Sequence, residues 1–83
     1  MTDVLKQPIW GDIFLMRLPH QTIEDQSEIC CAIETFARSG RGDVSFHGGE
    51  DRPIVNIRTK NFVVMARVDS FAETIFALDF FRK

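Results

Sequence analysis

Four of the eight phenylalanines of this chain lie in its last fourteen residues, Ser70-Phe-Ala-Glu-Thr-Ile-Phe-Ala-Leu-Asp-Phe-Phe-Arg-Lys83. The structure of this segment decides which surfaces of the fold are buried. Ser70 with Glu73 three residues later forms a capping box, a pattern typical of a helix N-terminus. Arg82 and Lys83 would place positive charge at the C-terminal end of that helix, where the helix dipole favours cations. The sequence therefore predicts a helix over Ser70–Lys83.

The apolar residues of this predicted helix do not fit on one side. At about 100° per residue, one stripe holds Phe71, Ile75 and Leu78. Phe76 and Phe80 point to nearly the opposite side. Because a lone two-layer domain cannot bury both sides, we expect a second protein surface to cover Phe76 and Phe80.

An earlier helix is predicted over Ile23–Ser39. Thr22 and Asp25 form an acidic variant of the capping box at its start, and Gly40 suits the left-handed conformation that ends many helices. The apolar face of this helix carries Ile29, Cys30, Ile33, Phe36 and Ala37. Such an amphipathic pattern indicates that the face packs on a sheet.

The remaining ordered segments are predicted to be strands. Ile9–Leu18 is apolar on both sides over most of its length, as in a strand that is covered on both faces. Asp43–His47 alternates between apolar and polar residues. Ile54–Thr59 and Phe62–Val68 flank Lys60-Asn61, where an asparagine that tolerates positive φ favours a tight hairpin.

Together these segments predict a single two-layer α+β domain over residues 1–83, with residues 1–8 as an extended arm. The fold would be a four-stranded, mainly antiparallel sheet with two helices, in the order β-α-β-β-β-α. Two helices cover only one face, so the other face of the sheet should expose apolar side chains. Trp10 is a further candidate, because an aromatic ring with a polar N–H is a common interface anchor; such a residue is equally often a lid on the core. The predicted protein-interface residues are Trp10, Val63, Met65, Phe76, Phe80 and Phe81.

Composition narrows the class of protein. A net charge of −2 and a pI near 5.6 give no basic field for phosphates, so nucleic-acid binding is disfavoured. Cys30 and Cys31 are adjacent, a geometry that opposes a disulfide between them, so reduced thiols and a cytoplasmic location are expected. No apolar stretch reaches the length of a membrane span.

Alternative sites carry weaker patterns. His47 and the glycine-rich loop up to Asp51 are the best place for a small-ligand site or a minimal enzyme, although they match no known metal cage or catalytic arrangement. A nucleic-acid reader would need the basic residues Arg38, Arg41, Arg52, Arg58, Lys60 and Arg67. Arg58 and Arg67 lie on predicted neighbouring strands and are expected to share a face.

The predicted element order is similar to that of the N-terminal domain of ribosome hibernation factors, and the similarity would imply RNA binding. The mildly acidic composition does not match the basic surfaces of those proteins. The leading hypothesis is a small non-enzymatic interaction module, without cofactor, metal or catalytic residues, that self-associates or docks on a larger protein as a regulator, adaptor or inhibitor.

Overall fold

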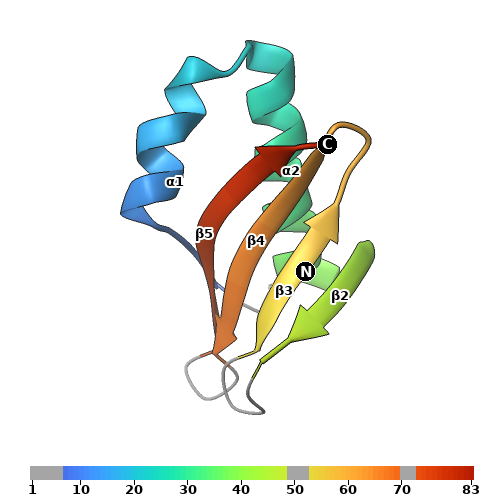
Figure 1. The fold of residues 1–83 in the computed structure, drawn as a ribbon. Helices are drawn as coiled ribbons and strands as arrows, with labels where there is room; N and C mark the ends of the chain where they lie inside the picture. Colours follow the sequence, from blue (N-terminus) through green and yellow to red (C-terminus); the bar gives the residue numbers. More distant parts are fainter. Residues whose placement is uncertain (1–6, 49–52, 70–72) are drawn as a thin grey trace.

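A computed structural model describes residues 7–48, 53–69 and 73–83 (Figure 1). The elements in chain order are β1 (Gln7–Trp10), α1 (Asp12–Arg17), the 3-10 turn η1 (Leu18–His20), α2 (Ile23–Ser39), β2 (Asp43–His47), β3 (Ile54–Arg58), β4 (Phe62–Asp69) and β5 (Thr74–Arg82). The strands form one five-stranded sheet in the order β1-β5-β4-β3-β2. β1 is parallel to β5, and the other neighbours are antiparallel.

The prediction of a small α+β domain with one sheet and two helices is confirmed. The predicted four-stranded sheet and the order β-α-β-β-β-α are wrong, because the sheet is mixed with five strands and the chain ends in a strand. The similarity in element order to hibernation factors therefore does not hold. Of the predicted arm over residues 1–8, residues 1–6 lie outside the described residues, and β1 already begins at Gln7.

α2 matches its prediction residue for residue. The Thr22 side chain accepts a hydrogen bond from the backbone N–H of Asp25 (3.1 Å), and Gly40 ends the helix with a φ of 69°. Burial follows the predicted apolar face, which contributes Ile29, Ile33, Phe36 and Ala37 to the core. Cys30, at the margin of that face, is half-buried.

The predicted strand over Ile9–Leu18 is wrong beyond Trp10. β1 ends there, opposite Ala77 of β5, and α1 starts two residues later. Asp12 in the first turn and Arg17 in the last turn both favour the helix dipole, and the leucine and methionine between them are strong helix formers. Only Phe14 of α1 is buried, so this apolar run is not covered on two sides.

Gly11, between β1 and α1, is required by a close approach of two backbones. Its N–H donates to the carbonyl of Ala77 (3.0 Å). A Cβ atom at this position would lie 2.5 Å from that carbonyl oxygen and 2.8 Å from Cε1 of Phe76. Glycine therefore lets the chain leave the sheet edge and turn directly into α1.

The predicted helix over Ser70–Lys83 is also wrong, because its described part is the strand β5. Ser70, the first residue of the predicted capping box, lies outside the described residues. Glu73 has a φ of 54°, which is left-handed rather than helical. β5 pairs with β4 along its length and is rich in the aromatic and β-branched residues that favour strands.

A β-bulge at Leu78 explains why β5 has helix-like spacing. The pairing passes from Ala66↔Ala77 to Met65↔Asp79 and leaves Leu78 without a partner in β4. Strand alternation shifts by one residue at such a bulge. The side chains that β5 buries are therefore Ile75, Ala77 and Phe80.

The core lies between α2, α1 and one face of the sheet. Its members are Phe14, Ile29, Ile33, Phe36, Ala37, Val55, Ile57, Phe62, Val64, Ala66, Val68, Ile75, Ala77 and Phe80. Phe80 is central, since its ring makes edge-on contacts with Phe14 (5.3 Å between centroids) and Phe62 (6.0 Å). The outward orientation that we predicted for Phe80 is wrong: its side chain is only 1% exposed.

The β3–β4 hairpin is confirmed, but its turn is stabilised differently from the prediction. Asn61 does not adopt positive φ. Instead, the Glu28 carboxylate on α2 accepts hydrogen bonds from the Thr59 hydroxyl, the Asn61 N–H (2.8 Å) and the Asn61 side-chain amide (2.8 Å). These bonds, led by that of Thr59, hold the pKa of Glu28 below its usual value. A helix carboxylate thus fixes the hairpin turn.

Candidate protein-interaction surface

No helix or strand among the described residues covers the face of the sheet opposite the helices, and we call it the outer face (Figure 1). The strand register places apolar side chains next to one another across it: Ile9 opposite Phe76, Phe81 opposite Val63, and Met65 between them on β4. Exposure is 43% for Ile9, 40% for Phe76 and 47% for Phe81, which is high for large apolar residues. Ile54 adds a half-buried side chain to this surface.

Charged groups on the outer face are mostly paired. Arg58 donates to the carboxylate of Asp43 (2.8 Å) and the hydroxyl of Ser45 (3.2 Å). The hydrogen bond and charge of Arg58 lower the pKa of Asp43, and the pKa of Arg58 is raised by the same contact.

A second ion pair joins α1 to the rim of the outer face. Arg17 binds the carboxylate of Asp79 and the backbone carbonyl of Phe80, and its guanidinium lies 4.8 Å from the Phe80 ring centre and 5.5 Å from that of Phe81. The Arg17 guanidinium therefore covers the edge of β5 beside Phe81.

Arg67 differs from these cations. Its cross-strand neighbours are Phe76 on one side and Ile54 on the other, and it is exposed. Among the described residues, no carboxylate contacts its guanidinium. The outer face thus combines an apolar surface with one unpaired positive charge, and the expectation that Arg58 and Arg67 share a face is confirmed.

Four of the six predicted interface residues come together on the outer face: Val63, Met65, Phe76 and Phe81. Trp10 and Phe80 do not join them. The Trp10 ring is half-buried and packs on Phe14 (5.4 Å between centroids), and Phe80 belongs to the core. Whether the four outer-face residues bind a partner stays a prediction.

Sequence reasoning missed a second exposed apolar group, on α1. Ile13, Leu15 and Met16 are 59%, 48% and 72% exposed. The predicted strand over Ile9–Leu18, covered on both faces, implies that these side chains are buried, and the structure shows that they are exposed. The acidic and basic ends of α1, at Asp12 and Arg17, were the signal that could have revealed a short helix.

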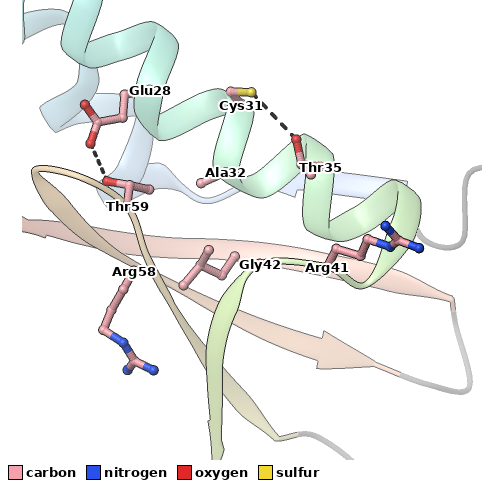
Figure 2. A pocket seen from close by; sticks show the side chains of 9 residues that line it. Glu28, Cys31, Ala32, Thr35, Arg41, Gly42, Arg58 and Thr59 are labelled. Atoms are coloured by element: carbon pink, nitrogen blue, oxygen red, sulfur yellow. Dashed lines mark hydrogen bonds between the residues drawn. The ribbon is translucent and has the colours of Figure 1, made fainter.

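A pocket of about 300 Å³ lies between α2 and the adjoining ends of β2 and β3 (Figure 2). Cys31, Ala32 and Thr35 line it from the helix, and Gly42 and Ile57 from the sheet side. Its polar groups bind one another: Glu28 accepts from Thr59, and the Cys31 sulfur lies 3.6 Å from the Thr35 hydroxyl. Arg58, at its margin, points away from α2 in Figure 2. These groups do not converge on a common point where a substrate would react.

The other predicted site, at His47 and the adjoining loop, is described only in part. His47 is exposed at the end of β2, with Nε2 3.3 Å from the Ser45 hydroxyl, and residues 49–52 of the adjoining loop lie outside the described residues. Within the described ranges, no three histidine, cysteine or carboxylate side chains form a metal-ligand group. Both cysteines are free thiols, and burial followed by the charge of Glu34 raises the pKa of Cys30.

Comparison with known proteins identifies no family for this chain: no protein-family model and no curated protein matches it. In the part of the chain that the structure describes, neither helix has the length and apolarity needed to span a bilayer.

Proposed function

We propose that this protein is a non-enzymatic interaction module that docks on a larger protein through the outer face. The observation that carries the proposal is the exposed apolar surface of Ile9, Phe76 and Phe81 next to the unpaired Arg67. Contiguous apolar surface of this kind typically marks a protein contact. An arginine that becomes buried when a partner binds often contributes a large part of the binding energy. The natural partner surface is apolar and carries a carboxylate that meets Arg67.

Charge favours a different protein over a second copy at this face. The described carboxylates of the outer face are engaged: Asp43 binds Arg58, Asp79 binds Arg17, and Asp69 has a partner as well. A second copy packed face to face would therefore bury Arg67 without a free carboxylate, and an unpaired buried charge is costly. Among the described arginines of the outer face, Arg67 alone has no carboxylate partner, and a single cation there on an acidic chain gives little attraction for nucleic acid.

The test is a pull-down from a native lysate with three tagged proteins: wild type, Phe81→Asp and Ile23→Asp. Ile23 is 75% exposed at the start of α2 and serves as the matched control away from the outer face. We expect wild type and Ile23→Asp to retain the same stoichiometric protein and Phe81→Asp to lose it, with similar melting temperatures for all three. Arg67→Glu, tested as an additional bait, should also lose it.

Three outcomes would contradict the proposal: recovery of the protein with all three baits, recovery of nucleic acid instead, or no stoichiometric partner. Partner identity decides whether the role is that of a regulator, an adaptor or an inhibitor. A cytoplasmic location remains a prediction that fractionation of the source cells can check.

A further inference from the structure

The two edge strands of the sheet differ in how well they are protected from pairing with a further strand. β1 forms one edge with only four residues, and Pro8 among them has no N–H to offer to another strand. Where β1 ends, Arg17 donates to the Phe80 carbonyl (2.7 Å), and the Phe80 N–H donates to the Asp79 carboxylate (2.8 Å). The N–H and C=O of Phe80, in the part of β5 beyond β1, are thus occupied, which opposes further strand pairing there.

β2 forms the other edge, and the described part of the chain gives it no such protection. It pairs with β3 without interruption, from Asp43↔Arg58 to His47↔Ile54, so no bulge twists it away. The strand contains neither proline nor lysine. Its other side has no neighbouring strand among the described residues. A regular edge of this kind presents a row of unpaired N–H and C=O groups to an incoming strand.

We propose that β2 pairs antiparallel with β2 of a second copy of this chain, with the two-fold axis at Ser45. This register sets Asp43 opposite His47 of the second copy, and the symmetry repeats the pair. Arg58 binds Oδ1 of Asp43, so Oδ2 can accept a hydrogen bond from His47 while the ion pair with Arg58 is kept. An imidazole N–H can donate to a carboxylate in either protonation state, and Nε2 of His47 already lies near Ser45, which leaves Nδ1 for the second copy. Opposite charges or hydrogen-bonding partners in direct cross-strand positions stabilise a sheet.

The apolar side of β2 fits the same register. Val44 would lie opposite Phe46 of the second copy, on the face that α2 covers. Phe46 is 55% exposed although its ring packs 6.0 Å from that of Phe36. A strand from a second copy would cover this ring and continue the core layer across the two-fold axis. Because a pair of five-residue strands buries less than a standard interface, we expect micromolar rather than nanomolar affinity.

This contact leaves the outer face free. A two-fold axis that joins two edge strands in one continuous sheet runs perpendicular to that sheet. The outer faces of the two copies would therefore lie side by side on the same side of the dimer. Self-association through β2 and docking through Phe76 and Phe81 use separate surfaces. An experiment that refutes one of the two proposals therefore leaves the other intact.

Cross-linking tests the register. In full-length protein with Cys30→Ala and Cys31→Ser, Ser45→Cys places the new thiol opposite its own copy, within the Cα separation that a disulfide spans. His47→Cys is the matched control, because His47 would face Asp43. Mild oxidation should yield a disulfide-linked dimer for Ser45→Cys and little for His47→Cys. Equal cross-linking of the two variants, or none in either, would overturn the proposed pairing.

Sedimentation equilibrium tests the charge pair without new thiols. Wild type should show twice the 9.5 kDa monomer mass at high concentration. His47→Lys keeps the attraction to Asp43, whereas His47→Asp opposes two carboxylates twice in each dimer and should weaken dimerisation roughly tenfold. Similar melting curves would show that both variants are folded. A monomer at every concentration, equal association of both variants, or dissociation caused by Phe81→Asp instead would refute this interface.

Discussion

Phe80 and Phe81 are adjacent in β5, yet they lie on the two faces of the sheet and in different environments. Phe80 faces the helices, is 1% exposed and contacts the rings of Phe14 and Phe62. Phe81 faces away from them, is 47% exposed and lies opposite Val63. The comparison shows that the alternation of side chains along β5, and not residue type, decides which phenylalanine joins the core and which stays exposed.

The largest effect is expected from Phe80→Ala, with Phe81→Ala as its matched control. Removal of the Phe80 ring leaves a cavity among Phe14 and Phe62 and should lower the free energy of unfolding by about 3–5 kcal/mol. Phe81→Ala should lower it by less than about 1 kcal/mol, because the site is already solvated. Urea unfolding at neutral pH measures both. Equal losses would show that the two faces are not distinct in the folded protein.

Gly11→Ala is expected to have an intermediate effect on the free energy of unfolding. Gly11 contacts both the backbone of Ala77 and the ring of Phe76 on the outer face. The added methyl group would meet the Ala77 carbonyl oxygen and the Phe76 ring at contact distances that force a shift. We expect a loss of about 2 kcal/mol, together with altered aromatic NMR signals of Phe76 on the outer face.

Gly40→Ala is the control for Gly11→Ala. A Cβ atom at Gly40 meets nothing within 4 Å, so its cost of about 1 kcal/mol comes from the positive φ alone. The Phe76 signals should not change in this variant. If Gly11→Ala also leaves them unchanged, the close packing of β1 on β5 is wrong.

The segments that sequence reasoning located well are those whose signals are local. α2 has a cap at Thr22, a left-handed glycine at Gly40 and a regular apolar face between them, and all three appear in the structure. β2, β3 and β4 show plain alternation or dense β-branched residues, and their bounds agree with the prediction to within one residue. These patterns can be recognised in each segment without knowing which other segment it pairs with.

The errors arose where local patterns imitate another structure. The bulge at Leu78 interrupts the two-residue period of β5, so the buried residues Ile75, Ala77 and Phe80 do not show the regular alternation that identifies a strand. A bulge is set by pairing with β4, which the sequence of β5 alone does not reveal. The turn from β1 into α1 depends in the same way on the contact of Gly11 with Ala77.

The candidate surface was predicted in part for the wrong reason. Phe76 and Phe81 were assigned to an interface as residues of a helix, and they are exposed because alternate strand positions face away from the helices. Val63 and Met65 were placed correctly, since β4 was recognised as a strand with two apolar faces. Phe80 is predicted to be exposed, whereas the bulge at Leu78 turns its side chain toward the helices.

The smallest expected effect concerns Glu28, at the rim of the buried layer and far from the outer face. Glu28→Gln keeps the size of the side chain but loses the charge that accepts hydrogen bonds from Thr59 and Asn61. The site is partly solvated, so we expect a loss of about 1 kcal/mol at pH 7. Glu34→Gln, on the exposed side of the same helix, should cost less and is the control.

The pH dependence of this loss has a definite sign. The folded state lowers the pKa of Glu28, mainly through the Thr59 hydrogen bond, so the ionised form is the one that stabilises the fold. Its contribution is complete above the unfolded-state pKa of about 4.3 and disappears as pH falls through the lower folded-state value. The difference in unfolding free energy between wild type and Glu28→Gln should therefore shrink in acid. Because Asp43 also has a lowered pKa, the wild-type curve alone does not isolate Glu28, whereas its difference from Glu28→Gln does. A difference that stays constant from neutral pH to below pH 4 would mean that the carboxylate does not hold the hairpin turn through its charge.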